Sequence, residues 1–162
     1  MIARLFLNLT EYPAFRRFIW KPVYEIMAKR ITIPDWQFMN YGYAPSPREL
    51  SLTLLSEDEI NRYPLQLYHY LVSILDVEGS EMLEVGSGRG GGAHYIQNYL
   101  RPKKITGLDI AANAVKLANK NHAGRDLHFV QGNAEDLPFV DESFDVVINV
   151  ESCHAYGSVP SF

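Results

Sequence analysis

The sequence predicts an α/β fold built on a parallel sheet, and three observations support this prediction. From Glu81 onward, short apolar strands alternate with helical segments over short connections, a pattern typical of a parallel sheet with helices on both faces. The first strand runs into a glycine-rich loop at residues 86–92. The chain has 162 residues, 47% of them apolar and 21% charged, which is enough for a buried core and too apolar for a disordered chain.

Charge and cysteine content narrow the classes of function. The net charge of −4 argues against a general nucleic-acid-binding protein, because such proteins present a basic surface. A single cysteine excludes a disulfide framework and fits a reducing compartment. No apolar run is long enough for a membrane span, and the histidines and acids show no metal-ligand spacing. We therefore expect a cytoplasmic protein without a metal site.

Residues 1–78 are predicted to form an N-terminal helical cap, and residues 79–162 the core of the fold. In the cap, apolar residues at three- and four-residue spacing predict a helix, which Pro22 should kink or split. This apolar stripe consists of Phe15, Phe18, Ile19, Val23, Ile26 and Met27. Residues 1–30 hold six basic and two acidic residues. We interpret the helix first as a lid that packs on the core, and alternatively as a peripheral helix on an anionic membrane surface.

The rest of the cap is predicted to be a loop followed by a second helix. Residues 34–47 are rich in aromatic residues and prolines and have neither helical nor strand periodicity, so we expect an ordered loop. Ser56 followed by Glu59 matches a capping box, and a helix should run from about residue 57 to residue 75. Pro64 either kinks this helix or marks its true start.

The core is predicted to contain four strands and two helices. The strands are expected at residues 82–85, 104–109, 127–131 and 144–150, and the helices at residues 93–100 and 111–123. The fourth strand is apolar and β-branched on both faces, which is typical of a strand in the middle of a sheet.

The glycine-rich loop is the main candidate for a ligand site. Gly86, Gly88 and Gly91 form a G-x-G-x-x-G pattern between a strand and a helix, and Asp109 ends the next strand. This is the context of a nucleotide-binding loop, in which the backbone approaches the ligand and the carboxylate accepts hydrogen bonds from ribose hydroxyls. The alternative is a glycine-rich turn with a solvated aspartate. A nicotinamide cofactor and S-adenosylmethionine both fit the pattern.

Three further features favour S-adenosylmethionine. Glu84 places a carboxylate at the end of the first strand, where it can receive a ligand ammonium but would repel a pyrophosphate. Residues 132–139 follow the third strand, and the fourth strand ends in residues 149–151 rather than in a phosphate-binding patch. Together with the glycine loop, these features resemble the class I S-adenosylmethionine-dependent methyltransferases.

The resemblance covers three motifs of that family. Residues 83–90 resemble its first motif, residues 107–110 its ribose-binding strand end, and residues 132–139 its adenine-binding segment. It implies S-adenosyl-L-methionine as cofactor and a Rossmann-like, doubly wound sheet, of which this chain holds the first four strands in the order 3-2-1-4, with the later strands missing. The implied cofactor-binding residues are Glu84, Gly86, Ser87, Gly88, Gly90, Asp109, Ile110, Asn133 (where the family usually has Asp), Ala134 and, from the aromatic loop, Tyr41.

A more specific resemblance concerns the methyl acceptor. Residues 86–93 and 150–156 resemble the phthiotriol/phenolphthiotriol dimycocerosates methyltransferase group, and residues 38–43 are similar to an aromatic segment that lines the site in related enzymes. That group O-methylates a hydroxyl on a very hydrophobic lipid. The resemblance therefore implies methyl transfer to a hydroxyl, or a carbon, of a lipid-like or small-molecule acceptor.

An alcohol acceptor would benefit from a base. His154 is the candidate, because it lies just beyond the fourth strand, where the ligand crevice of such folds opens; the alternative is a histidine that only packs locally. Glu151 is expected to act as a base or an orienting residue, or only to hold backbone amides. Arg89 is expected either to bind the carboxylate of the cofactor or to be solvated.

Two other functions stay open: a NAD-dependent oxidoreductase, and a non-catalytic remnant that binds the cofactor without turnover. The sequence also predicts that the fourth strand, without later strands beside it, forms an unprotected edge. We therefore expect the isolated chain to be poorly soluble or oligomeric, and weakly active.

Overall fold

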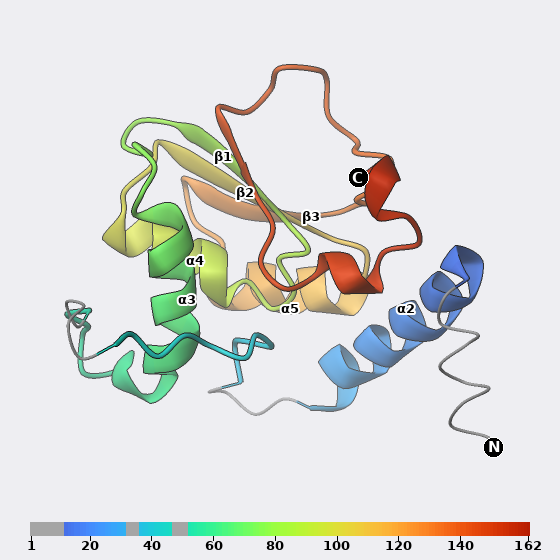
Figure 1. Cartoon of the computed structure of the whole chain (residues 1–162), viewed down its shortest axis with the longest axis horizontal. Helices are drawn as coiled ribbons and strands as arrows, with labels where there is room; N and C mark the ends of the chain where they lie inside the picture. The colour runs from blue at the N-terminus through green and yellow to red at the C-terminus, as the bar shows by residue number, and fades with distance from the viewer. Residues whose placement is uncertain (1–11, 32–35, 47–51) are drawn as a thin grey trace.

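The computed structural model describes residues 12–31, 36–46 and 52–162 (Figure 1). Its helices are α2 (Pro13–Arg30), α3 (Arg62–Val72), α4 (Gly91–Tyr99) and α5 (Ala112–His122), and its strands are β1 (Glu81–Val85), β2 (Lys104–Asp109), β3 (Leu127–Gln131) and β4 (Val146–Ile148). Three short 3₁₀ helices are η1 (Glu59–Asn61), η2 (Cys153–Ala155) and η3 (Val159–Ser161). The alternation of strands and helices from residue 81 onward confirms the predicted α/β class.

The strands form one parallel sheet in the order β3-β2-β1-β4, which confirms the predicted order. Strands β2 and β3 also have the predicted bounds. Strand β4 is shorter than predicted and lies at the edge, where Val147 is 53% exposed. Among the described strands only β1 pairs with β4, so its apolar sequence does not place it in the middle of this sheet.

Helices α3, α4 and α5 pack on one face of the sheet, below the strands in Figure 1. The other face carries Leu83, Val85 and Leu108, because successive side chains of a strand alternate between faces. Phe139 and Phe144 from the connection between β3 and β4 cover it. In the described part of the chain, a connecting segment therefore covers the face on which a helix was expected. The shared core on the first face includes Val72, Ile96, Ala118, Met82, Ile105 and Phe129.

Helix α2 continues without a break through Pro22, so this proline does not split it. The predicted apolar stripe is wrong at two positions, since Phe18 is 78% and Ile26 56% exposed. The inward side instead carries Trp20, Tyr24 and the buried Ala28, at the four-residue spacing of one helix face. Trp20 and Tyr24 stack with 5.8 Å between their ring centroids.

Helix α3 begins at Arg62, so Pro64 lies in its first turn, where the missing N–H of a proline costs no helical hydrogen bond. The predicted capping box is not formed: the Ser56 hydroxyl donates to the Glu57 carboxylate, and Glu59 pairs with Arg62. Across the described ranges, no helix combines the length and the apolar character needed to cross a membrane.

Candidate active site

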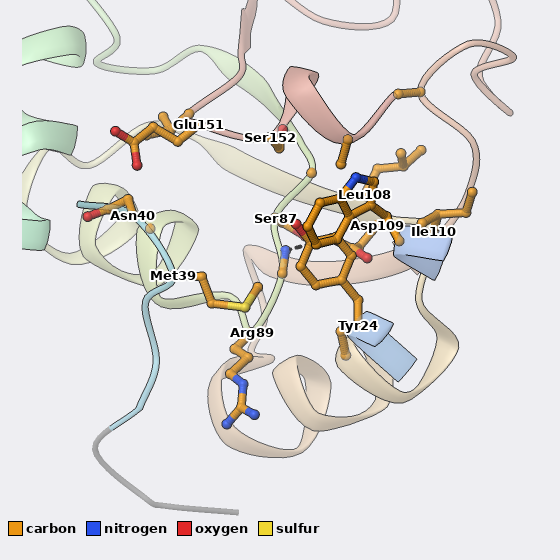
Figure 2. Close-up of a pocket in the computed structure, with 18 of the residues that line it drawn as sticks. Tyr24, Met39, Asn40, Ser87, Arg89, Leu108, Asp109, Ile110, Glu151 and Ser152 are labelled. Carbon is orange, nitrogen blue, oxygen red and sulfur yellow. Dashed lines mark hydrogen bonds between the residues drawn. The ribbon is translucent and has the colours of Figure 1, made fainter. Parts of the chain in front are cut away.

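A cavity of about 560 Å³ opens at the carboxyl ends of the strands. Its walls come from α2, residues 36–41, Tyr68 of α3, the glycine loop, the end of β2, and the segments that follow β3 and β4 (Figure 2). Most of the predicted site residues border it: Gly86, Ser87, Gly88, Asp109, Ile110, Asn133, Ala134, Tyr41, Glu151 and His154. Glu84 and Gly90 do not lie among its lining residues.

The glycine loop is folded tightly against the end of β2. Gly86, Gly88 and Gly90 have φ angles of +78°, +54° and +86°, a region that favours glycine. The backbone N–H groups of Gly86 and Ser87 donate to the Leu108 carbonyl at 2.8 and 3.0 Å. A Cβ at Gly86 would lie 2.1 Å from the Ser152 hydroxyl oxygen, so the approach of these two segments requires glycine there.

Asp109 fastens this loop to β2. Its Oδ2 accepts a hydrogen bond from the Gly88 N–H at 2.8 Å, and its Oδ1 accepts one from the Ala111 N–H at 2.8 Å. Burial raises the pKa of Asp109 above its ordinary value, and both N–H groups oppose this rise. Each carboxylate oxygen can accept more than one hydrogen bond, so Asp109 keeps capacity for a ligand hydroxyl.

The walls around Asp109 fit a nucleoside. The Ser87 side chain is buried, and its hydroxyl has no hydrogen-bond partner among the described residues, which leaves a polar group on the cavity wall for a ligand to satisfy. Ile110 and Ala134 add apolar surface, and Asn133 borders the cavity while its Oδ1 accepts from the Glu135 N–H at 3.2 Å. These residues suit a ligand with an apolar ring and hydroxyl groups, such as an adenosine.

Glu84 lies behind the glycine loop and is 1% exposed. Its Oε1 accepts a hydrogen bond from the Tyr68 hydroxyl at 2.6 Å, whereas its Oε2 has no partner among the described residues. Burial raises the pKa of Glu84 from 4.5 to about 7. An unsatisfied, buried carboxyl group next to a cavity wall formed by Tyr68 is a site where a nearby cation would stabilise the charged form.

The two candidate residues after β4 differ in their surroundings. The Glu151 carboxylate accepts a hydrogen bond from the Tyr41 backbone N–H at 2.8 Å, and Glu151 has a φ of +49°. Tyr41 borders the cavity, but its side chain is 96% exposed. His154 lies in η2, borders the cavity and meets the Trp20 ring edge-on at 6.5 Å. Glu151 thus holds the aromatic segment, and His154 remains available at the cavity.

Arg89 is 4% exposed, so the expectation of a solvated side chain is wrong. Its guanidinium stacks 4.4 Å from the centroid of the Trp36 ring and donates to the backbone carbonyls of Trp36 and Met27. Figure 2 shows its side chain pointing away from Asp109. Arg89 therefore ties the glycine loop to the C-terminal end of α2 and to the aromatic segment.

Several lining residues were not predicted from the sequence. Tyr24 points toward Asp109 and Ser87 (Figure 2), and Trp20 and Tyr68 also border the cavity. The four-residue spacing of Trp20, Tyr24 and Ala28 could have indicated the inward face of α2. For Tyr68 the signal is absent, because its approach to Glu84 depends on how α3 packs on β1.

Known proteins share both the sequence and the fold. A methyltransferase domain family matches residues 83–162. A fatty-acid O-methyltransferase from Mycolicibacterium smegmatis is 46% identical over 84% of this chain and 49% of its own length. A phthiotriol/phenolphthiotriol dimycocerosates methyltransferase from Mycobacterium leprae is 40% identical over 89% of this chain and 53% of its own length. The chain thus spans about half the length of these curated relatives.

Among solved structures, the YcgJ protein from Bacillus subtilis superposes with a TM-score of 0.53 and 24% identity, covering 58% of this chain and 41% of that one. This likeness supports the fold alone. The matched domain, in contrast, spans the glycine loop, the Asp109 strand and the segments after β3 and β4. The chain therefore belongs to the S-adenosylmethionine-dependent methyltransferase family.

Proposed function

We propose that this chain binds S-adenosyl-L-methionine in the cavity and transfers its methyl group to an oxygen, or a carbon, of a lipid-like acceptor. The observation that carries the proposal is the glycine loop fastened to Asp109 at the cavity floor, with the unpartnered Ser87 hydroxyl beside it. A glycine loop and a strand-end carboxylate are the groups that recognise the ribose part of a nucleoside or nucleotide, and the free hydroxyl offers one more polar contact.

The two ends of the cofactor would meet different residues. Asp109 would accept hydrogen bonds from the ribose hydroxyls, with Ile110 against the adenine ring and the segment Asn133–Ala134 at its edge. The loop from Gly86 to Gly90 would hold the methionine end. A ligand ammonium near Glu84 would favour the charged carboxylate and lower its pKa from about 7.

Bound S-adenosyl-L-methionine supplies a methyl group on a sulfonium, which is already reactive toward a nucleophile. The chain would therefore act by aligning the acceptor and excluding water. His154 would take the proton of an acceptor hydroxyl, because its ring lies at the cavity and its neighbour Trp20 makes only a ring contact. Glu151 would act as a positioning residue, since its carboxylate holds the Tyr41 backbone.

An apolar acceptor suits the far wall of the cavity. Trp20, Trp36, Phe38 and Met39 border it, and such side chains favour a hydrocarbon over a charged substrate. The curated relatives named above act on a fatty acid and on phthiotriol-type lipids, as their names state. A lipid-like acceptor for this chain is inferred from both observations.

Calorimetric titration tests the cofactor, and transfer of a radiolabelled methyl group to a fatty acid or a fatty alcohol tests the reaction. We expect S-adenosyl-L-methionine to bind and NAD not to bind. The Asp109→Ala variant should lose affinity, whereas Asp141→Ala, in the connection between β3 and β4, should keep it. Binding of NAD alone would overturn the proposal, and cofactor binding without transfer to any acceptor would indicate a non-catalytic chain.

Three expectations remain predictions: a cytoplasmic location, a division into a cap (residues 1–78) and a core (residues 79–162), and the absence of a nucleic-acid partner. Self-association through β4 is also a prediction.

A further inference from the structure

The outer face of α2 exposes apolar and basic side chains together. Phe18 and Ile26 are 78% and 56% exposed. The exposed Lys29 lies on the same side of the helix, as the helical repeat requires for residues spaced by eight and eleven positions. The exposed Lys21 and Arg30 flank this side. This side of α2 therefore combines large exposed apolar side chains with cations.

The inner face of the same helix is already occupied. Trp20 and Tyr24 border the cavity. Glu25, the only acidic residue of α2, accepts hydrogen bonds from the backbone N–H groups of Ala112 and Asn113 at 2.7 and 3.0 Å. By the helical repeat Glu25 lies between Lys21 and Phe18, at the edge of the outer face. The exposed Lys21, Lys29 and Arg30 outnumber this one acid, so the face is net positive.

We infer that this face, with Phe18, Ile26, Lys29 and their basic neighbours, docks on a bilayer surface rich in anionic lipids. Cations of an interfacial helix are attracted to anionic headgroups, and its apolar side chains enter the boundary between headgroups and acyl chains. The sequence predicted two alternative roles for this helix, a lid on the core and a helix on a membrane surface. On this inference, the inner face of α2 has the first role and its outer face the second.

The uneven charge of the chain fits an anionic bilayer as the partner of α2. Residues 1–30 hold six basic and two acidic residues, whereas the complete chain has a net charge of −4. An anionic surface would attract α2 and repel the acidic remainder, which orients the molecule with α2 and the adjoining cavity toward the lipid. The inference rests on the proposed function in one respect: docking would bring the cavity close to a lipid acceptor in the bilayer.

Flotation of the full chain with vesicles tests the inference. Vesicles of phosphatidylcholine with about one third phosphatidylglycerol should bind the chain, vesicles of phosphatidylcholine alone should not, and high salt should release it. The double variants Phe18→Ser/Ile26→Ser and Lys29→Glu/Arg30→Glu should each bind about tenfold less or weaker still.

Two matched controls should bind like the wild type. Ile74→Ser removes an apolar side chain that is 81% exposed and lies beyond the end of α3. Lys120→Glu/Arg125→Glu makes the same change in net charge at the far end of α5 and in the loop after it. Circular dichroism melts verify that all four variants are folded.

The outcomes separate docking from the proposed function. Equal vesicle binding by wild type and both α2 variants, or equal binding to neutral vesicles, refutes docking. A wild-type dimer that Phe18→Ser/Ile26→Ser converts to a monomer, with no vesicle binding, makes this face a contact between copies and also refutes it. A chain that binds S-adenosyl-L-methionine but no vesicles refutes docking alone, and the reverse result refutes the cofactor proposal alone.

Discussion

At the scale of single residues, Gly86 combines a left-handed backbone with a crowded position. Its φ is +78°, and a Cβ there would lie 2.1 Å from the Ser152 hydroxyl oxygen. Gly86→Ala should lower the free energy of unfolding by about 2–3 kcal/mol, because strain and a clash add, and should abolish cofactor binding. Gly79→Ala is the matched control: φ is +74° and nothing lies within 4 Å, so about 1 kcal/mol is expected. Urea unfolding measures both variants, and equal losses would contradict the role of the Ser152 contact.

Glu84 should make stability depend on pH. Burial raises its pKa from 4.5 to about 7, so between these values the folded state holds a proton that the unfolded chain has released. The contribution of Glu84 is then complete below about pH 4.5 and is lost as the pH rises through about 7. Relative to Glu84→Gln, the wild type should lose up to about 3 kcal/mol between these limits.

Urea unfolding of both proteins at a series of pH values measures this difference. The comparison with Glu84→Gln is needed because His122 acts in the opposite sense. Burial and the neighbouring His94 lower the pKa of His122 from 6.5 to about 4, so its contribution is complete above about 6.5 and is lost as the pH falls through about 4. His122 is common to both proteins and cancels. A difference that does not change with pH would contradict a raised pKa for Glu84.

At the scale of elements, α2 supplies the cap that α5 lacks. The N-cap position of α5 is Ala111, which offers no side-chain acceptor, and the Glu25 carboxylate accepts from Ala112 and Asn113 instead. Glu25→Ala should therefore cost about 1 kcal/mol of unfolding free energy and speed amide hydrogen exchange in α2. The exposed Glu78→Ala serves as control and should do neither. If amide exchange became faster in α5 alone and stayed unchanged in α2, Glu25 would cap α5 without holding α2 in place.

The elements also differ in how far the sequence predicted them. Strands β2 and β3 have the predicted bounds because each is an apolar run ended by turn residues, a local signal. The inward face of α2 was mispredicted, since several of its faces are apolar and the choice between them depends on what α5 and the cavity offer. The burial of Arg89 was missed for the same reason: its acceptors, the Trp36 and Met27 carbonyls, lie far away in the sequence. The motif residues around Asp109 were placed at the cavity correctly because a strand end fixes their position, while their roles in binding stay predictions.

At the scale of the whole molecule, the sheet ends in an open edge among the described strands. Strand β4 pairs with β1 alone, and Val147 is 53% exposed. Unpaired backbone groups beside exposed apolar side chains favour pairing with another chain, and a lysine on an edge strand opposes it. We expect the chain to self-associate with rising concentration, and Val147→Lys to raise the fraction of monomer in sedimentation velocity runs.

The variant Val140→Lys tests whether Val147→Lys acts by blocking the β4 edge or only by adding a positive charge. Val140 is 82% exposed in the connection between β3 and β4, so this variant adds the same charge away from the ladder and should associate like the wild type. If both lysine variants raise the fraction of monomer equally, net charge and not the β4 edge controls association. If only the variant Phe18→Ser/Ile26→Ser dissociates it, the contact lies on α2. A wild type that stays monomeric over about a hundredfold range of concentration removes the prediction altogether, because the short β4 edge would then be too small to hold two chains together.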